Sequence, residues 1–217
     1  MSDTLKVSDC CHSEMGKGRL LSADMNMFVY RDIAEARETW EALYCGADAS
    51  PYQSFAWFSA WFNEIGAPQG WTAHILVLRD GVGEALALLL LVARRRSGLT
   101  LVEFAGGKHS NLNMPLLRSN ACSRLNKFVV TLLLDDFASL FEGVVVLRLL
   151  NMPEFWIGKR NPLISSAAQP SPSLFYAALL TDEITGASAA SPQRRRKINY
   201  SGSSRILVGK NLGAMSQ

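Results

Sequence analysis

The sequence predicts a mixed α+β domain, in which an antiparallel meander of strands is flanked by helices. Apolar residues recur with helical spacing in two segments before residue 66 and in one segment after residue 121. Between residues 74 and 106, three apolar runs follow one another and are separated by short turns that contain glycine. The expected order, β-α-α-β-β-β-loop-α-β-loop-β, differs from the strict alternation of a doubly wound parallel sheet.

The first two elements are a short strand and a helix. The residues MFVYR at 27–31 are rich in strand-forming types. Asp32 and Glu35 follow with the spacing of a capping box, in which Asp32 would be the N-cap. We therefore expect a helix that starts after Asp32 and ends near Tyr44.

A second helix follows the breaker segment 46–51. Ser54 can cap its N-terminus, and Gly66 is expected to end it. One face of this helix carries an aromatic stripe, which favours a core-facing surface and could also form one wall of a ligand pocket. The stripe consists of Phe55, Phe58, Trp61, Phe62 and Ile65.

Three consecutive runs predict the meander. They cover residues 74–80, 84–92 and 99–106, with turns at Asp80–Gly83 and Arg94–Gly98. The middle run contains the longest apolar stretch of the chain, which is far shorter than the roughly 20 residues of a membrane helix. We therefore interpret it as a buried strand and expect no membrane span.

The rest of the chain divides into a helix, a strand and less regular segments. We expect a helix at 122–140, a strand at 144–150, a loop at 151–163 and a further strand at 173–180. By composition, residues 1–24 form a disordered N-terminus, 25–185 the folded domain, and 186–217 a linker and disordered tail.

Composition and charge exclude several function classes. The chain has 217 residues, of which 48% are hydrophobic, and its net charge is only +3. It lacks the basic excess of a dedicated nucleic-acid binder, so we expect no nucleic-acid partner. Its four cysteines form no C-x-x-C pair, so we expect no metal site and a reducing, cytoplasmic location.

The loop 106–115 is the best candidate for a binding site. Gly106 and Gly107 allow a sharp turn and a close approach of a ligand to the backbone. Several side chains that donate or accept hydrogen bonds follow within six residues, and such a loop at the end of a strand can orient a polar substrate. These side chains are Lys108, His109, Ser110, Asn111 and Asn113. An ordinary polar connection between a strand and a helix is the alternative interpretation.

His109 is the candidate catalytic base, because histidine is the side chain that most often exchanges a proton near neutral pH. A solvent-exposed loop histidine is the alternative. The segment Arg95–Thr100 approximates the R-x-x-G-x-G/A pattern with which acetyltransferases hold the pyrophosphate of coenzyme A. That chemistry requires a junction between a strand and a helix. Because Arg95–Thr100 lies between two strands, we interpret it as a hairpin turn.

Four segments together resemble a known family. They are PYQSFAWFSAWF at 51–62, the strand-turn-strand from Ile75 to Leu90, LVEFAGG at 101–107 with Ser110, Asn113 and Pro115, and NPL at 161–163. In their order and spacing they resemble the CelD-like acetyltransferases of bacterial cellulose and exopolysaccharide biosynthesis, in the GNAT superfamily. The resemblance covers roughly residues 26–200.

The resemblance implies a GNAT-like acyl-CoA N-acyltransferase half-domain. It implies acetyl transfer from acetyl-CoA, as co-substrate, to an amine or hydroxyl of a small-molecule or saccharide acceptor. The acceptor would lie near the helix 52–62 and the loop 106–115, with His109 as base. The substrate-binding residues would then be Tyr52, Trp57, Gly106, Gly107, Ser110 and Asn113.

The similar proteins are longer than this chain. After a basic stretch like Arg194–Lys197 they continue as a charged helix and a second acyltransferase half, in which the acyl-CoA site is expected. We therefore expect this chain to be the N-terminal half only, without the acetyl-CoA site. The alternative function is a non-catalytic remnant or interaction module, because loss of half of a tandem fold exposes an apolar face that promotes self-association.

Overall fold

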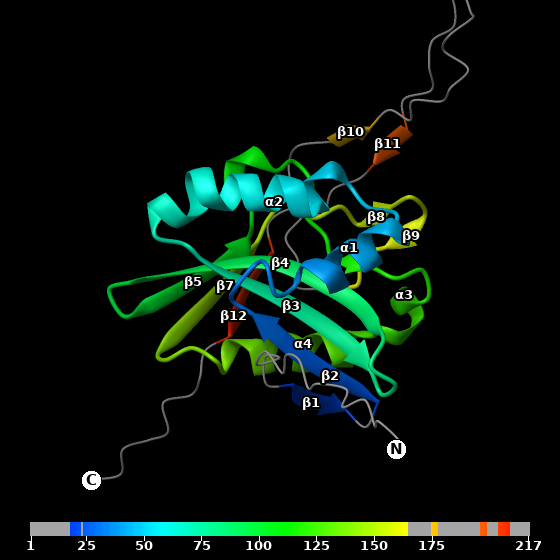
Figure 1. Cartoon of the computed structure of the whole chain (residues 1–217), viewed down its shortest axis with the longest axis horizontal. Helices are drawn as coiled ribbons and strands as arrows, with labels where there is room; N and C mark the ends of the chain where they lie inside the picture. The colour runs from blue at the N-terminus through cyan, green and yellow to red at the C-terminus, as the bar shows by residue number, and fades with distance from the viewer. Residues whose placement is uncertain (1–17, 23, 165–174, 178–195, 199–203, 209–217) are drawn as a thin grey trace, which may run out of the picture.

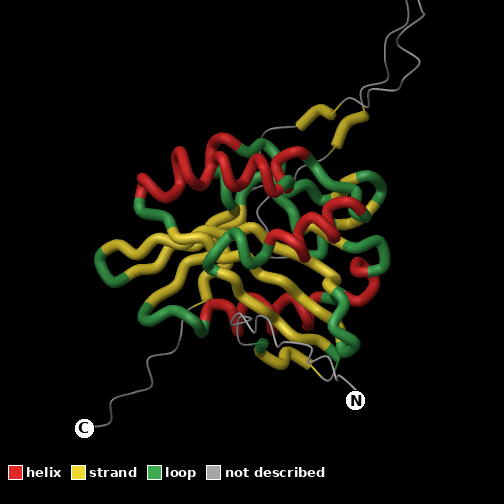
Figure 2. Tube along the Cα trace, in the orientation of Figure 1, coloured by secondary structure: helices red, strands yellow, loops and turns green. Residues whose placement is uncertain are grey.

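The structure is a computed structural model that describes residues 18–22, 24–164, 175–177, 196–198 and 204–208. A curled, mostly antiparallel sheet lies between two layers of helices (Figure 1). Helices α1 (Arg37–Cys45) and α2 (Phe55–Trp61) cover one face, and α4 (Lys127–Ala138) covers the other. Figure 2 shows the same three layers, with the strands as the central one. The mixed α+β class predicted from the sequence is confirmed.

The main sheet consists of β1 (Arg19–Ser22), β2 (Met25–Tyr30), β3 (Thr72–Asp80), β4 (Ala85–Arg96), β5 (Leu99–Phe104), β6 (Leu116–Leu117), β7 (Val144–Leu149) and β12 (Ser204–Val208). Among the described residues the order is β1-β2-β3-β4-β5-β7-β12, and β6 pairs with β4. Neighbouring strands are antiparallel, except that β5 and β7 are parallel. Helix α4 lies in the crossover that a parallel pair requires.

The predicted meander is confirmed as β3, β4 and β5, but β4 is longer than its apolar run. It continues through Arg96, and the turn shrinks to Ser97 and Gly98, whose φ angles are +49° and +79°. The backbone of Arg94–Arg96 still pairs with that of Leu99–Leu101. Backbone pairing does not need apolar side chains, so the arginines extend the hairpin. The hairpin interpretation of Arg95–Thr100 is confirmed.

The β3–β4 turn is organised by Asp80. One carboxylate oxygen accepts hydrogen bonds from the backbone N–H groups of Val82 and Glu84, and the other lies 3.0 Å from the Arg124 guanidinium. Burial acts to raise the pKa of Asp80, but these hydrogen bonds and the charge of Arg124 hold it below its ordinary value. Asp80 thereby links the turn to the helical segment that follows the meander.

The first helix begins later than predicted. The Asp32 carboxylate accepts a hydrogen bond from the backbone of Ala34, 2.8 Å away, and so closes a local turn. Helix α1 starts only at Arg37, after Ala36, which makes no side-chain cap. The capping box predicted from Asp32 and Glu35 is therefore wrong, because a short acidic side chain can satisfy its own turn instead of a helix end.

Helix α2 begins as predicted but does not end at Gly66. The Ser54 hydroxyl accepts a hydrogen bond from the backbone N–H of Trp57 at 3.2 Å. Beyond Trp61 the helical path continues through a π-turn at Phe62–Gly66 and a 3-10 turn at Ala67–Gln69. It ends at Gly70, whose φ of +78° is the left-handed conformation typical of a helix C-terminus.

The predicted helix at 122–140 is divided in two. A short α3 (Ala121–Arg124) precedes α4, and the chain turns between them at Leu125 and Asn126. The side-chain oxygen of Asn126 then caps α4 by accepting the backbone N–H of Val129 at 3.0 Å. Asparagine is a favoured N-cap residue, so this break has a clear local cause.

Two apolar cores lie on opposite faces of the sheet. Leu89 and Leu91 of β4 pack in the core beneath α4, whereas Leu88 and Leu90 pack in the core beneath α1 and α2. Successive side chains of a strand point to opposite faces, so the uninterrupted apolar run of β4 reflects burial on both. The interpretation of this run as a buried strand is confirmed.

The sheet extends beyond the boundaries expected from composition. Strand β1, which lies in the segment expected to be disordered, pairs with β2. Strand β12, which lies in the expected tail, pairs with β7. The predicted strand at 173–180 contains β10 (Phe175–Ala177), which pairs with β11 (Arg196–Ile198). A hairpin of β8 (Phe155–Trp156) and β9 (Lys159–Arg160) lies in the predicted loop 151–163. Residues 1–17, 23, 186–195, 199–203 and 209–217 lie outside the described residues.

Candidate functional site

The loop predicted as a site leaves the sheet after β5 and packs directly against α2. Gly106 has a φ of +97°, and Gly107 has a φ of +47°. A Cβ atom at Gly106 would lie 2.6 Å from the Trp57 ring and 2.7 Å from the Cβ of Ser110. No atom lies within 4 Å of a Cβ at Gly107. Gly106 therefore permits a close contact, whereas Gly107 supplies only the turn.

Partly buried hydrogen bonds join this loop to the end of β7. The Ser110 hydroxyl donates to the side-chain oxygen of Asn113 at 2.7 Å, and the Asn113 amide donates to the Leu150 carbonyl at 3.0 Å. The Asn151 amide donates to the Ser110 carbonyl at 2.8 Å. Because β5 and β7 are parallel, their carboxyl ends meet at the same edge of the sheet, where open α/β sheets commonly bind ligands.

These contacts give Ser110 and Asn113 a positioning role. Both residues are buried, and the hydrogen bonds of their side chains hold the loop in place. The sequence predicted that they contact a substrate directly, and that role stays a prediction. The sequence did not single out Asn151, although the Asn-Met-Pro segment after a strand is a turn signal.

Aromatic side chains form a wall beside the loop. The rings of Tyr52 and Trp57 meet edge to face, with centroids 5.3 Å apart, and Trp57 stacks on Trp61 at 6.3 Å. Tyr52 and Trp57 are half-buried, whereas Phe58 faces the core. The structure thus brings two predicted binding residues, Tyr52 and Trp57, to the predicted loop through Gly106.

Gln53 is a positioning residue that the sequence analysis missed. Its side-chain amide donates to the Met114 carbonyl at 3.0 Å, and its side-chain oxygen accepts the backbone N–H of Ser50 at 2.8 Å. Its own carbonyl accepts the indole N–H of Trp40 at 2.8 Å. Gln53 therefore ties the aromatic segment to α1 and to the loop. A signal was present, since Ser50 and Gln53 have capping-box spacing.

His109 lies on the solvent side of this arrangement. It ends the 3-10 turn Gly107–His109, and its side chain is exposed, as is that of Lys108. The imidazole is therefore accessible from solvent. Its predicted role as a base stays a prediction.

A cavity that the sequence analysis did not identify lies at the opposite end of β5. Its volume is about 520 Å³, and its walls come from the amino ends of β3 and β5, the carboxyl end of β4 and the segment after α4. The polar and charged residues that line it are Arg31, Thr72, His74, Arg94, Arg95, Thr100 and Glu142.

His74 is the buried titratable group of this cavity. Its side chain packs against Phe137 and Phe141, and the residue is only 2% exposed. Burial, reinforced by the positive charge of Arg31, lowers the pKa of His74 to about 4. The imidazole is therefore neutral at pH 7. A strongly shifted pKa in a cavity is a reason to consider a functional site.

The hydrogen bonds of Thr72 determine which tautomer His74 adopts. The Thr72 hydroxyl lies 3.0 Å from the Ala93 carbonyl, which can only accept, and 3.1 Å from Nε2 of His74. Because a hydroxyl has one proton, it donates to Ala93 and accepts from Nε2–H. Nδ1 is then an acceptor. It is buried and has no hydrogen-bond partner among the described residues.

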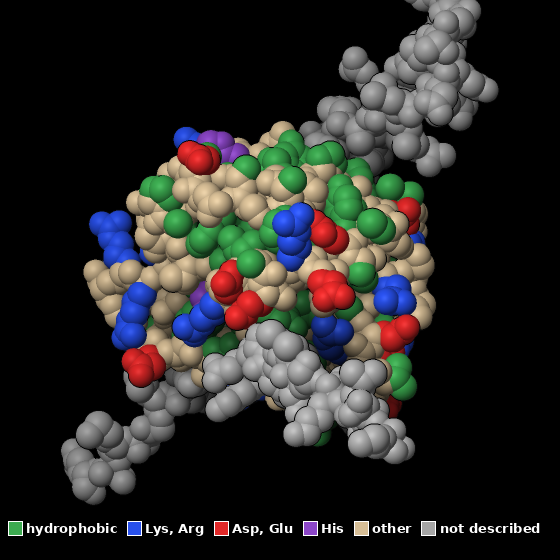
Figure 3. Space-filling view, in the orientation of Figure 1, with side chains coloured by type: hydrophobic (Ala, Val, Ile, Leu, Met, Phe, Trp, Pro, Cys, Tyr) green, Lys and Arg blue, Asp and Glu red, His purple; other side chains and the backbone are tan. Residues whose placement is uncertain are grey.

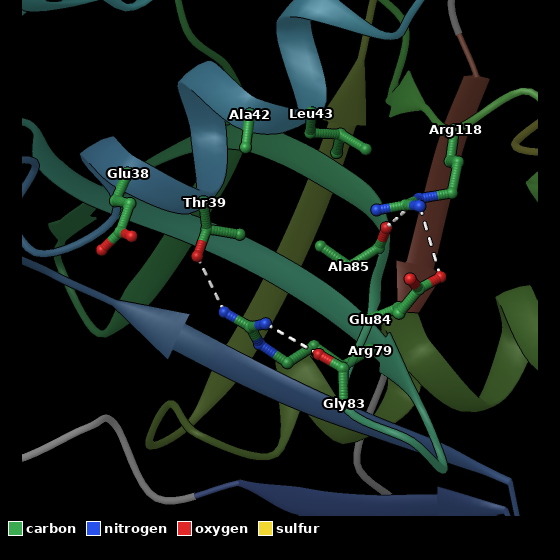
Figure 4. Close-up of a pocket in the computed structure, with 9 residues that line it drawn as sticks. All are labelled: Glu38, Thr39, Ala42, Leu43, Arg79, Gly83, Glu84, Ala85 and Arg118. Atoms are coloured by element: carbon green, nitrogen blue, oxygen red, sulfur yellow. Dashed lines mark hydrogen bonds and ion pairs between the residues drawn. The ribbon is translucent and has the colours of Figure 1, made fainter.

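A smaller cavity, of about 380 Å³, lies between α1 and the β3–β4 hairpin (Figure 4). Arg79 donates to the Thr39 hydroxyl and to the Gly83 carbonyl, and Arg118 donates to the Ala85 carbonyl and to Glu84. These arginines brace the hairpin against its neighbours. Their hydrogen bonds are used within the protein, so we do not assign this cavity a ligand.

The sequence resemblance implies acetyl-CoA, and two segments of this structure are candidates for holding its pyrophosphate. A pyrophosphate is usually held by free backbone N–H groups at a helix N-terminus. The segment Arg95–Thr100 is a hairpin turn between β4 and β5, and the N-terminus of α4 is capped by the Asn126 side chain. Neither segment fits the pyrophosphate, and we assign no described residue to acetyl-CoA.

Comparisons with known proteins gave no match: no family model, curated protein or solved structure matches this chain significantly. Within the described residues, no helix combines the length and apolar character needed to cross a bilayer. The same residues contain no group of three or more His, Cys, Asp or Glu side chains that could hold a metal ion.

Proposed function

We propose that this domain binds the acceptor of a GNAT-like acetyltransferase, which transfers an acetyl group to an amine or hydroxyl of a small molecule or saccharide. The observation that supports this best is the contact between Gly106 and Trp57, which places the polar loop against an aromatic wall. Ligand sites commonly combine apolar surface with a few placed polar groups. The resemblance to cellulose and exopolysaccharide acetyltransferases favours a saccharide.

In this proposal, Tyr52 and Trp57 pack against the apolar face of the acceptor. The attacking hydroxyl or amine loses its proton as its bond to the acetyl carbon forms, while the C–S bond of the thioester breaks and coenzyme A leaves as the thiol. We assign the role of the base that accepts the proton to His109, which is exposed on the loop. Ser110 and Asn113 act through the loop, because their hydrogen bonds fix the backbone that carries His109. The chemistry of the thioester belongs to acetyl-CoA, for which we assign no contact.

Titration with a soluble cello-oligosaccharide, followed by tryptophan fluorescence, tests the proposal. We expect saturable quenching, and we expect Trp57→Ala to weaken binding about tenfold, which corresponds to about 1.4 kcal/mol. Trp57→Phe keeps an aromatic ring and should retain most of the affinity. His109→Gln should bind like the wild type, since a base acts in the transfer step. An unchanged affinity in Trp57→Ala would contradict the proposed site.

A second candidate function is that of an interaction module, and one feature of the sheet favours it. Leu99 and Val144 are direct neighbours on β5 and β7, and they are 38% and 51% exposed. The next pair on the same face, Leu101 and Val146, is half-buried. These four side chains form an apolar strip, and such strips promote association.

Self-association through this strip is testable by sedimentation velocity over a range of concentrations. We expect a concentration-dependent increase in the sedimentation coefficient. Val144→Lys should weaken the association at least about fivefold, because a lysine opposes apolar contact at an interface centre. Val82→Lys is the matched control, since Val82 is 85% exposed and lies in the β3–β4 turn. Equal behaviour of the two variants would exclude the strip as the contact surface.

A further inference from the structure

We propose that the cavity around His74 is a binding site for a phosphate group carried by a small molecule. The site is separate from the proposed acceptor site, because Thr100 lies at the amino end of β5 and Gly106 lies beyond its carboxyl end. Three arginines and one glutamate line the cavity, so its charge is positive at neutral pH. A cavity lined by one predominant sign of charge concentrates ligands of the opposite sign.

Arg94 and Arg95 line the cavity, and neither forms a strong ion pair that would prevent it from binding a ligand. The Arg94 guanidinium lies 4.5 Å from the centre of the Trp71 ring, which orients it and leaves its N–H groups able to donate. Arg95 pairs with Glu142 at 3.4 Å, but the two side chains are 58% and 88% exposed. Exposed pairs of this kind contribute little, so Arg95 can exchange Glu142 for a phosphate.

The positive charge of Arg31 also acts inside the cavity. Arg31 lines the cavity, and its charge adds to burial in lowering the pKa of His74. Arginine binds phosphate oxygens through paired N–H groups, so Arg31 and Arg95 are the residues most suited to hold the anion. The hydroxyl-bearing residues Thr72 and Thr100 line the same cavity.

His74 makes the site more specific than a basic patch. It lines the cavity, it is 2% exposed, and its Nδ1 is an acceptor that lacks a partner among the described residues. An acceptor of this kind is completed by a ligand that can donate a hydrogen bond. A hydrogen phosphate carries both negative oxygens for arginine and a P–OH donor. Sulfate carries the oxygens but no donor at neutral pH.

The C-terminal end of α4 adjoins the cavity and does not prevent anion binding. A helix C-terminus carries partial negative charge on its last carbonyls. Here three of those carbonyls accept backbone hydrogen bonds, from Ser139 to Asp135, from Leu140 to Phe137 and from Phe141 to Ala138. Arg19 donates to the carbonyl of Asp136 and pairs with its carboxylate. The negative end of the helix is thus largely neutralised.

The volume of the cavity indicates that the ligand is larger than phosphate itself. Small-molecule sites typically have volumes of about 300–1,000 Å³, and this cavity falls within that range. Beyond the arginines, Leu140 and Phe141 supply apolar wall. We therefore expect a phosphomonoester with an apolar or aromatic part to bind more tightly than inorganic phosphate.

Isothermal titration calorimetry of the full chain at about pH 5.5 and constant ionic strength tests this site, with inorganic phosphate, phenyl phosphate and sulfate as probes. At this pH a phosphomonoester, whose second pKa is about 6, retains a P–OH donor, and His74 remains neutral. We expect phenyl phosphate to bind most tightly, and sulfate at least about tenfold more weakly than phosphate. Arg31→Gln and Arg95→Gln should each weaken phosphate binding about five- to tenfold. The matched control is Arg96→Gln, which removes the same charge at an exposed position that does not line the cavity.

Each alternative outcome overturns the proposal. If Arg96→Gln weakened phosphate binding as much as Arg31→Gln and Arg95→Gln do, the effect would be one of overall charge and not of this cavity. If sulfate bound as tightly as phosphate, His74 Nδ1 would have no role in binding. The ¹⁵N resonance of His74 Nδ1 gives a second measurement that needs no substitution, and it should shift on addition of phosphate. An unchanged resonance at saturating phosphate would contradict the site. Trp57→Ala should leave phosphate binding unaffected, which separates this inference from the proposed acceptor site.

Discussion

Gly106→Ala is expected to destabilise the domain by about 3 kcal/mol, because two costs add. A non-glycine residue in the left-handed region costs about 1–2 kcal/mol, and overpacking typically costs another 1–3 kcal/mol. Gly106 meets both conditions, with a φ of +97° and a Cβ position 2.6 Å from the Trp57 ring. The ring would have to move, and the aromatic wall would move with it.

Urea unfolding of the two neighbouring glycine variants provides the test. Gly107→Ala shares the positive φ but has open space around the added atom, so it should cost only about 1 kcal/mol. The difference between the two variants then measures the close contacts of the added methyl group with Trp57 and Ser110. If both variants lowered the unfolding free energy equally, the close packing of the loop against α2 would be wrong. Gly106→Ala should also impair saccharide binding more than Gly107→Ala does.

The free energy of unfolding of the domain is expected to decrease as the pH is lowered, because His74 becomes protonated in the unfolded state. The pKa of His74 is about 4 in the folded protein, against an ordinary value of 6.5. Above pH 6.5 the imidazole is neutral in both states, so it contributes nothing. Between pH 6.5 and 4 the unfolded state takes up a proton that the folded state does not. This stabilises the unfolded state by about 3 kcal/mol in total.

A comparison with His74→Gln isolates this contribution from that of the carboxylates. Urea unfolding at pH 7 and pH 4.5, in buffers without phosphate, should show that the wild type loses about 2–3 kcal/mol more than His74→Gln. Glutamine keeps an N–H donor for the Thr72 hydroxyl, which limits damage to the core. His109→Gln, at an exposed position, should behave like the wild type. The same loss in wild type and His74→Gln would show that the imidazole is not held neutral.

The candidate acceptor site was partly predictable from the sequence. Adjacent glycines followed by polar residues pointed to the loop 106–115, and the aromatic segment 51–62 stood out by composition. The sequence could not show that Gly106 contacts Trp57, because the two residues meet only when α2 packs on the sheet. It also could not show that Ser110 and Asn113 are occupied by hydrogen bonds within the protein.

The cavity around His74 was not predictable in the same way. His74 and the arginines at 94–96 were visible as single features, and each had an ordinary local interpretation. They become one site because antiparallel pairing places the start of β3 beside the end of β4, and because the end of α4 adjoins them. Segments up to 111 residues apart, from Arg31 to Glu142, thereby share one cavity, and no local pattern in the chain encodes that arrangement.

The sequence by itself determined the elements whose signals are local. The hydrophobic periods predicted the class and the meander, Ser54 predicted the start of α2, and the apolar run 85–93 predicted a buried strand. Tertiary structure decided the parallel pairing of β5 with β7, the addition of β1 and β12 to the sheet edges, and the partners of each polar side chain. The physical reason is the separation along the sequence over which each interaction acts. Periodicity and capping involve residues a few positions apart, whereas strand neighbours and buried hydrogen bonds depend on how distant segments pack around shared cores.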